Sequence, residues 1–350
     1  MEILAQYGLF LAQALTIVVA ILLVAGGLMA IGQRQKSPRE GRVEVRHLNE
    51  RYRRFGNSIR DAVESQAQQK QRAKRQKKAE KAREKAARKA AKAGEEPSGS
   101  KPRLYVLSFD GDLKASATEQ LREEISALLP QLREGDEVLL RLESPGGLVH
   151  GYGLAASQVQ RIRDAGVTLT IAVDKVAASG GYMMACVAER IIAAPFAVIG
   201  SIGVIAQLPN FHRLLKKHDI DFELLTAGEY KRTLTLFGEN TDKGREKFVE
   251  DLETTHGLFK DFVGRQRPSL DIDRVATGEI WYGQDAVGMG LVDAIQTSDA
   301  FIQERLEETD IYELRFVQRK HWQEKLGMAT EDALERSVLK LWQRNRGPHV

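Results

Sequence analysis

TLTIAVDKVAASGGYMMAC, residues 168–186, is an apolar, β-branched run followed by a turn of very small residues. The first six residues predict a buried strand, and the residues after Ser179 predict a short helix. Ser179 therefore stands at a strand-to-helix turn, with alanines before it and two glycines, Gly180 and Gly181, behind it. Such a turn exposes its central side chain and lets other backbone segments approach closely.

Strand and helix signals alternate on both sides of this turn. Apolar strands are predicted at residues 103–109, 137–142, 168–173, 190–194, 203–208 and 222–227, and helices at 117–132, 152–165, 211–218 and 245–265. Repeated β-α units with apolar strands predict an α/β fold with a largely parallel sheet covered by helices. The functional site of such a sheet lies in the loops beyond the carboxyl ends of its strands.

The N-terminal segment at residues 7–31 is apolar and carries no charge. It exceeds the roughly 20 residues that cross a bilayer, and it predicts a transmembrane anchor in a bacterial inner membrane. The alternative, a signal peptide, needs a basic start and a shorter apolar stretch. Eight Lys or Arg follow within residues 34–54 against a single Glu2 in front. The positive-inside rule therefore places the main domain in the cytoplasm, with the periplasmic face left open.

Four segments follow from composition: an anchor at 1–33, a basic, partly helical linker at 34–101, a folded domain at 102–298 and a charged helical tail at 299–350. Within the linker, residues 72–92 carry eleven Lys or Arg against two Glu, a net charge of +9. Because the whole chain is +4, everything else sums to −5, which argues against a nucleic-acid partner for the folded domain. The basic segment is either a solvated tether or a surface for anionic lipid.

Several chemistries are excluded by what the sequence lacks. One cysteine, Cys186, permits neither an internal disulfide nor a cysteine-built metal site. Neither a phosphate-binding GxxxxGK[ST] loop nor an HExxH zinc motif is present, and no cofactor or metal is expected.

Three glycine-bearing turns follow predicted strands, at residues 144–147, 178–181 and 200–203. Each alone is most simply a tight turn, but together they lie where a parallel sheet presents ligands. Ser179 meets the needs of a serine nucleophile, since the amides at the start of the following helix face a developing oxyanion. Gly146 and Gly147 could form the second wall of that oxyanion hole.

The general base is not obvious from the sequence. His150 and His212 are the nearest histidines, and Lys231 is a third candidate because it follows the predicted strand at 222–227. A catalytic lysine needs a pKa lowered from about 10.4 by burial, whereas a lysine after a strand is most often a surface charge. These three candidates remain open at this point.

Four ordered motifs carry a resemblance to a known family: SPGG at 144–147, DKVAASGGYMMAC at 174–186, GSIGV at 200–204, and LLTAGEYKRTLTLFGENTDKGREKF at 224–248. Over residues 104–295 the chain resembles the signal peptide peptidase A family of serine proteases, and within it the SohB-type inner-membrane branch. The resemblance implies a ClpP/crotonase-like fold and a Ser-Lys dyad, with Ser179 as nucleophile and Lys231 as base. It further implies Gly147 and Gly180 as oxyanion donors and Ser201 as the residue that orients the lysine.

The same resemblance implies polypeptide substrates, apolar or like signal peptides, and a homo-oligomeric ring or dome in which serine and lysine can come from neighbouring subunits. Membrane lipid is the expected partner of the N-terminal helix. Two alternatives stay open, a crotonase-like acyl-CoA enzyme and a non-enzymatic membrane scaffold. Neither alternative would need Ser179 or Lys231.

Overall fold

The computed structural model describes residue 16, residues 41–92 and residues 101–318. Val43–Phe316 form one compact unit. The predicted anchor at 1–33, apart from Thr16, and most of the predicted tail lie outside the described residues. In the part of the chain that is described, no helix is both long and apolar enough to cross a bilayer.

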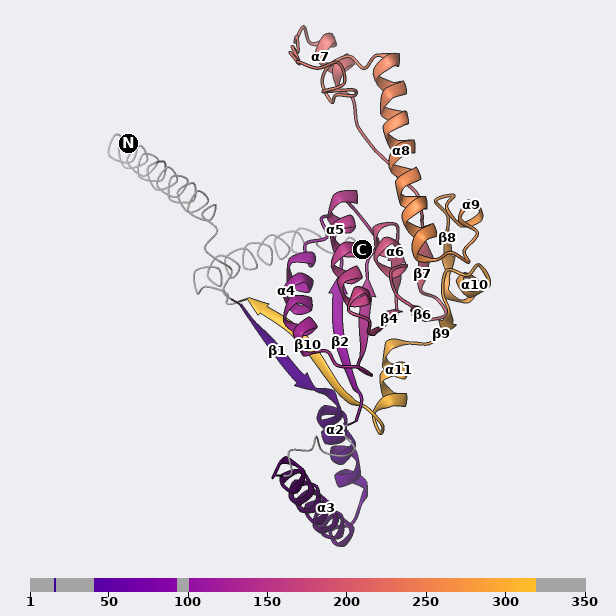
Figure 1. Ribbon diagram of the computed structural model, residues 1–350. Helices are drawn as coiled ribbons and strands as arrows, with labels where there is room; N and C mark the ends of the chain where they lie inside the picture. The colour runs from indigo at the N-terminus through magenta and orange to yellow at the C-terminus, as the bar shows by residue number, and fades with distance from the viewer. Residues whose placement is uncertain (1–15, 17–40, 93–100, 319–350) are drawn as a thin grey trace, which may run out of the picture. The chain divides into compact units, whose positions relative to one another are not determined.

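A seven-stranded sheet forms the centre of the fold, in the strand order β1-β10-β2-β3-β4-β6-β9 (Figure 1). All pairings from β10 to β9 are parallel. The strands are β1 (Gly41–His47), β10 (Asp310–Gln318), β2 (Arg103–Asp110), β3 (Glu137–Glu143), β4 (Thr168–Val173), β6 (Arg190–Ala193) and β9 (Ala294–Ile295). The mixed α/β class and the four predicted strands at the positions of β2, β3, β4 and β6 are therefore confirmed.

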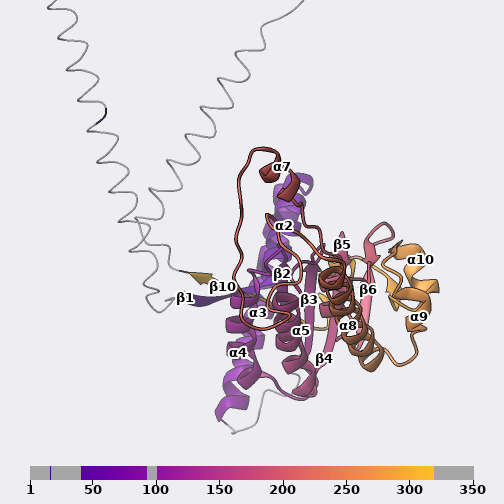
Figure 2. The same cartoon turned by 90° about the horizontal axis from the view of Figure 1, so that it is seen from above.

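Helices cover both faces of this sheet because alternate residues of each strand point to opposite sides. On β2, Tyr105, Leu107 and Phe109 enter the larger core under α4 (Thr118–Leu128) and α5 (Val149–Asp164). Leu104 and Val106 enter the smaller core with α2 (Leu48–Val63) and α11 (Ser298–Arg305). Helices α4 and α5 lie side by side in both ribbon views (Figures 1 and 2), and a 3-10 turn at Leu129–Gln131 follows α4.

A second, three-stranded sheet holds β5 (Val176–Ala178), β7 (Val198–Gly200) and β8 (Ile280–Tyr282). The pair β5–β7 is parallel and the pair β7–β8 is antiparallel. A bridge between Ser144 and Ala177 joins the end of β3 to β5. The glycine turn after β3 therefore meets the turn after β5, from which α6 (Gly180–Ala185) begins.

The compact unit is longer than the folded domain predicted at 102–298. The predicted linker contributes β1 and α2, and the predicted tail contributes most of α11 and all of β10. Asn49 on α2 ties these two parts together: its Nδ2 donates to the carbonyls of Leu306 (2.9 Å) and Thr309 (2.8 Å), and its Oδ1 accepts the N–H of Ile311 at 2.7 Å. The buried amide thus fixes the start of α2 to the entry of β10.

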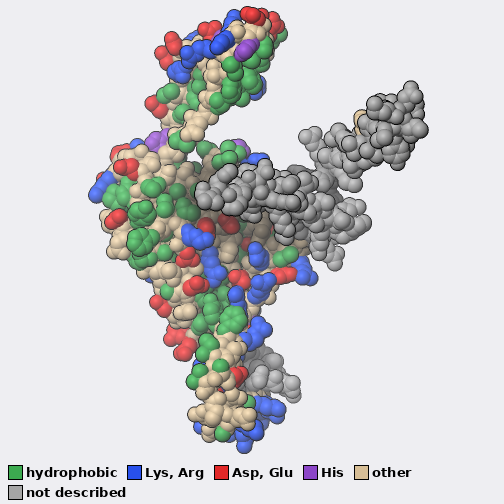
Figure 3. Space-filling view, turned by 180° about the vertical axis from the view of Figure 1, so that it is seen from behind, with side chains coloured by type: hydrophobic (Ala, Val, Ile, Leu, Met, Phe, Trp, Pro, Cys, Tyr) green, Lys and Arg blue, Asp and Glu red, His purple; other side chains and the backbone are tan. Residues whose placement is uncertain are grey.

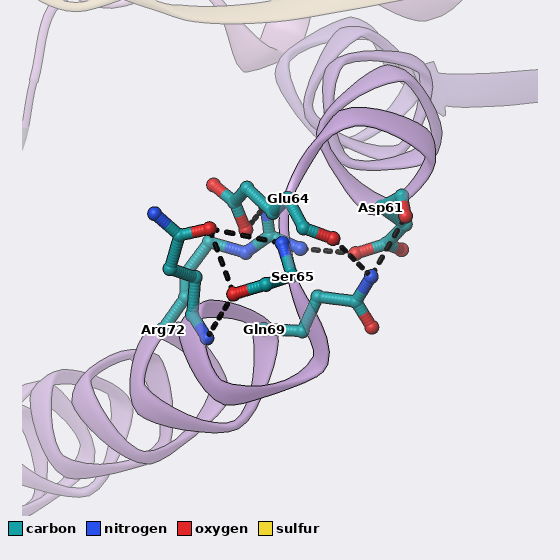
Figure 4. Close-up of polar contacts among 6 residues, drawn as sticks. Asp61, Glu64, Ser65, Gln69 and Arg72 are labelled. Atoms are coloured by element: carbon teal, nitrogen blue, oxygen red, sulfur yellow. Dashed lines mark hydrogen bonds and ion pairs between the residues drawn. The ribbon is translucent and has the colours of Figure 1, made fainter.

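Helix α3 (Gln66–Lys92) continues from α2 through a corner held by side chains (Figure 4). Arg72 pairs with both Asp61 and Glu64 at the end of α2. Gln69 Nε2 donates to the carbonyl oxygens of the same two residues, at 2.7 and 3.1 Å. The helix prediction for the basic segment agrees with α3, and its direction from α2 is set by these contacts.

Residues 204–241, here called the arm, connect β7 to α8 (Asp242–Gln266) and include α7 (His212–Lys217). The arm packs on itself: the Phe211 N–H donates to the Leu236 carbonyl at 2.7 Å, and Phe237 stacks on Phe211. The predicted strands at 203–208 and 222–227 are wrong, since neither segment forms a strand. An apolar run becomes a strand only beside a partner for its N–H and C=O groups, and the described chain offers none there.

From the arm, α8 returns to pack against α6 and α9 (Ile272–Val275), and α10 (Gly283–Gly288) follows β8. Four segments that are distant in sequence, around residues 111, 146, 179 and 200, consequently converge at the carboxyl ends of β2, β3, β5 and β7.

Candidate active site

Ser179 occupies the turn between β5 and α6 in a conformation that side chains rarely adopt. Its φ is 51° and its ψ is −118°, a region normally left to glycine. Such a sharp strand-to-helix turn lifts the side chain away from the sheet, as a serine nucleophile requires. The residue is half-buried, and its hydroxyl caps none of the α6 amides. The hydroxyl is therefore not committed to holding the helix.

Ser201 lies beside Ser179 because the two residues follow paired strands. Ala178 and Gly200 are register partners in β5–β7, and the Ser179 N–H donates to the Gly200 carbonyl at 2.8 Å. Ser201 also has a positive φ, 50°, and its N–H donates to the Glu279 carbonyl at 2.6 Å. The structure thus brings these two serines together at one edge of the second sheet.

Gly146 places the SPGG turn directly against the candidate nucleophile. Its φ is +90°, and a Cβ added there would lie 2.7 Å from both Ser179 Cβ and the Ala178 carbonyl oxygen. A Cβ on the next residue, Gly147, would collide with the backbone of Leu113. Only glycines allow three backbone segments to meet this closely.

The two amides expected to form an oxyanion hole are free. Neither the Gly147 N–H nor the Gly180 N–H donates a hydrogen bond to another group in residues 41–92 and 101–318. Gly180 is the first residue of α6, so its N–H has no acceptor within the helix. Two free amides next to a serine hydroxyl match what a tetrahedral oxyanion requires.

Lys231 is the predicted site residue that the structure does not bring to Ser179. It lies in the arm with an exposed side chain, and its N–H donates to the Gly228 carbonyl at 3.2 Å. Within the described residues no hydrogen bond or ion pair joins Lys231 to Ser179 or Ser201. The sequence argument had put Lys231 near the serine through a strand at 222–227, and that strand is absent.

The other titratable candidates do not reach the serine either. His150 is exposed in the first turn of α5, and His212 lies on α7 in the arm. Cys186 is fully buried at the C-terminal end of α6, where burial raises the pKa of its thiol. No cluster of His, Cys, Asp or Glu in residues 41–92 and 101–318 is arranged to hold a metal ion. Ser179 therefore stays the candidate nucleophile, on the basis of its strained strand-to-helix turn.

Comparison with known proteins gives the family. The family model for peptidase family S49 N-terminal matches residues 2–159, and that for peptidase family S49 matches residues 161–311. A probable protease SohB from Haemophilus influenzae is 53% identical over 333 residues, which are 95% of this chain and 94% of that protein. The chain belongs to peptidase family S49.

This S49 chain is also 63% identical over 203 residues to a probable protease SohB from Buchnera aphidicola subsp. Schlechtendalia chinensis, covering 58% of this chain and 67% of that protein. The resemblance to SohB-type proteases is thereby confirmed. Among solved structures, the 1510-N membrane-bound stomatin-specific protease, as a lysine-to-alanine mutant with a substrate peptide, aligns at 12% identity with a TM-score of 0.40. It covers 67% of this chain and 99% of that one.

Three residues around the site were not singled out as functional by the sequence analysis: Gly111, Ser144 and Tyr152. Gly111 follows β2, Ser144 opens the SPGG turn, and Tyr152 lies on α5. The available signal was Gly111, a glycine two residues after the strand predicted at 103–109, at the same end of the sheet as the other turns. Tyr152 carried no signal, because a tyrosine on the buried face of a helix is normally core.

Proposed function

We propose that this S49 protease is a serine endopeptidase in which Ser179 attacks the peptide carbonyl and the Gly147 and Gly180 amides hold the resulting oxyanion. The observation that carries the proposal is the strained turn of Ser179 beside two unpaired amides. Membership of a protease family favours this reading over an acyl-CoA enzyme or a scaffold. The turn, the neighbouring glycines and the free amides together support a ClpP/crotonase-like arrangement.

The reaction begins when a neutral amine removes the proton from Ser179 Oγ, which then bonds to the carbonyl carbon. The carbonyl π electrons move to oxygen, and the two amides stabilise that negative charge. The protonated amine gives its proton to the leaving nitrogen, so the peptide bond breaks and an acyl-serine remains. Water activated by the same amine then releases the acyl group. Since only a neutral amine accepts a proton, activity should rise towards alkaline pH, and a flat profile from about pH 6 to 9 would argue against this base.

Lys231 is our proposed base, supplied by a second copy of the chain in a homo-oligomer, with Ser201 orienting its amine. Support comes from the exposure of Lys231 and from the apolar side chains that the arm leaves uncovered (Figure 3). They include Ile205, Leu208, Leu214, Ile220, Leu224 and Leu225. A second copy that covered this surface would also provide the desolvated surroundings that a lysine base needs.

The proposed substrates are extended, apolar polypeptide segments such as signal-peptide remnants. Leu113, Leu148 and Val149 are exposed next to the Gly147 turn, and the Leu148 N–H donates to the Leu113 carbonyl at 2.9 Å. These side chains would contact the residues of a peptide lying over the oxyanion amides. Cleavage mapping on a peptide library by mass spectrometry tests this, and equal cleavage of charged and apolar peptides would refute it.

Attachment to the inner membrane through residues 7–31, with the active site in the cytoplasm, is also proposed. Phe55, Ile59 and Val63 form an exposed apolar stripe on α2, at 57%, 68% and 82% exposure, and α3 presents exposed lysines such as Lys74 and Lys78. An apolar stripe next to a basic helix fits an anionic lipid surface. Protease protection of the catalytic domain in sealed inverted and right-side-out vesicles would establish its side of the membrane.

The decisive experiment is reaction of the detergent-solubilised full chain with a fluorophosphonate, followed by peptide mass spectrometry. We expect one labelled serine, Ser179, and no label or peptide cleavage with Ser179→Ala. Ser157→Ala is the matched control, because Ser157 is an exposed helix serine whose hydroxyl bonds only to the Gly153 carbonyl. Labelling of another serine, or full cleavage by Ser179→Ala, would refute the proposed nucleophile.

A further inference from the structure

A single buried hydroxyl chain runs from the SPGG turn into the core. The Gly146 N–H donates to Ser144 Oγ at 3.1 Å, Ser144 Oγ lies 2.6 Å from Tyr152 Oη, and Tyr152 Oη donates to the Asp112 carbonyl at 2.8 Å. Ser144 and Tyr152 are both fully buried. The chain therefore crosses three segments that surround the nucleophile: residues 111–116, residues 144–148 and α5.

The direction of every hydrogen bond in this chain is fixed by proton counting. Tyr152 has one hydroxyl proton, and the Asp112 carbonyl can only accept it. Ser144 must therefore donate its own proton to Tyr152 Oη, which leaves a Ser144 lone pair for the Gly146 N–H. Burial raises the pKa of Tyr152, which favours the protonated phenol that this arrangement requires. No member of the chain can reverse without leaving a buried group unpaired.

The backbone of Ser144 is held as firmly as its side chain. Its N–H donates to the Val176 carbonyl at 2.8 Å, and its carbonyl accepts the Ala178 N–H at 3.0 Å. Ser144, which directly follows β3, is thus clamped against β5, and its carbonyl is bonded to Ala178, the residue immediately before the nucleophile. By holding the Gly146 N–H, its hydroxyl shapes the turn that leaves the next amide, that of Gly147, unpaired and available.

Tyr152 also supports the other oxyanion donor. A Cβ added to Gly180 would collide with the Tyr152 ring, so the ring packs directly beneath the Gly180 backbone. One side chain is therefore linked to both proposed oxyanion donors. Its ring packs against the Gly180 backbone, and its hydroxyl holds the turn before Gly147 through Ser144. Gly111 leaves no space to spare, since a Cβ there would lie 2.5 Å from both Ser144 Oγ and Tyr152 Oη.

We propose that Tyr152, acting through Ser144, is the positioning residue that sets the spacing between the oxyanion amides of Gly147 and Gly180. This inference rests on the proposed role of those amides in peptide hydrolysis. Within the described residues, the Tyr152 hydroxyl bonds to Ser144 and to the Asp112 carbonyl and not to Ser179, so it is proposed to act through the turn and not on the substrate. Its loss should leave substrate binding intact and weaken only the stabilisation of the transition state.

The test compares Tyr152→Phe with Tyr182→Phe in the full-length protein. Tyr182 is a matched control because it is equally buried and its hydroxyl also donates to one backbone carbonyl, that of Leu291, at 3.0 Å. We expect kcat on an apolar fluorogenic peptide to fall about 10- to 100-fold in Tyr152→Phe, with KM within about twofold, because complete loss of an oxyanion donor costs about 10²- to 10³-fold. Tyr182→Phe should keep kcat within about twofold of the wild type, by the same comparison.

A double-mutant cycle separates positioning from general stability. Ser144→Ala removes the next link, so the double variant Ser144→Ala/Tyr152→Phe should be no slower than the slower single variant. Additive losses, a loss confined to KM, or equal losses in Tyr152→Phe and Tyr182→Phe would each overturn the proposal. Gly111→Ala, which inserts a methyl group between the two hydroxyls, should reproduce the fall in kcat.

Hydrogen–deuterium exchange of residues 144–148 separates this inference from the proposed function. Exchange there should increase in Tyr152→Phe and stay unchanged in Tyr182→Phe, whether or not the protein is assayed with substrate. If Ser179→Ala remained active, the proposal that Ser179 is the nucleophile would be refuted. The exchange experiment would still show whether Tyr152 holds the turn at residues 144–148. If Ser179→Ala were inactive and Tyr152→Phe matched its control in both readouts, the positioning role alone would fail.

Discussion

At the scale of single residues, two of the four non-glycine residues with positive φ in the described chain lie where the chemistry is proposed. Ser179 and Ser201 both adopt positive φ without being glycines, at a cost of about 1–3 kcal/mol each. Each is held there by an N–H bond to a carbonyl of the adjacent strand or its extension. The second sheet, which has three strands, therefore imposes the turn of Ser179 as well as contributing Ala177 and Ile199 to the core.

Asp293 offers a test of stability at the same scale. Burial acts to raise its pKa, but hydrogen bonds from Arg267 and from the Ile191 N–H outweigh burial and hold the pKa below its usual value. A carboxyl with a lowered folded-state pKa stabilises the protein above its unfolded pKa, near 3.9, and loses that contribution as pH falls through the lower folded value.

We therefore expect Asp293→Asn to lower the free energy of unfolding by about 2 kcal/mol at pH 7, because Arg267 loses its carboxylate partner and keeps only the Gly290 carbonyl in the described chain. The difference from wild type should begin to shrink as pH falls below about 4, where the carboxyl is protonated in the unfolded chain, and should be lost below the lower folded-state pKa. Urea denaturation at pH 7, 5 and 3 measures it. Asp285→Asn, in the first turn of α10, is a control expected to change little.

At the scale of elements, a strand predicted from an apolar run forms only where the chain provides a neighbouring strand to pair with it. The runs at β2, β3 and β4 were found because strands of a covered parallel sheet are apolar on both faces. Runs of similar composition at 203–208 and 222–227 form no strand, since propensity does not supply a pairing partner. Strand β10 was missed for the opposite reason: DIYELRFVQ is rich in charge, and composition alone marks it as tail.

The junction of α2 and β10 was equally invisible in the sequence, and Asn49 holds it. Asn49→Ala would leave two carbonyls and one N–H unpaired at a buried position, so we expect a loss of about 2–4 kcal/mol of unfolding free energy. Asn57→Ala, on the same helix, should change stability by less than about 0.5 kcal/mol. Thermal unfolding of the two variants side by side measures the difference, and equal melting temperatures would contradict the role given to Asn49.

At the scale of the whole molecule, the predicted site residues divide into those that the structure brings together and Lys231, which makes no hydrogen bond to them in the described chain. Ser179, Ser201 and the two glycine turns could be predicted together because parallel strands bring their carboxyl ends to one edge. The position of Lys231 could not, because it depends on the arm, whose apolar surface has no partner in the described chain. If Lys231 reaches the serine by assembly, as proposed, no spacing rule within a single sequence would reveal it.

Mixing two inactive variants tests whether assembly completes the site. Ser179→Ala and Lys231→Ala should each be inactive alone, the first lacking the nucleophile and the second the base. If Ser179 of one subunit pairs with Lys231 of the next, a random one-to-one mixture of subunits should recover about a quarter of wild-type activity, since a site needs an intact serine and an intact lysine from adjacent subunits. The two variants are dissociated in detergent, mixed, and then allowed to reassemble. The oligomer size is checked by analytical ultracentrifugation. Recovery of activity that is absent when the unmixed variants are treated alike would establish pairing between subunits. A mixed oligomer of wild-type size with no activity would show that the serine and its base belong to the same chain, and that the arm must move to bring them together.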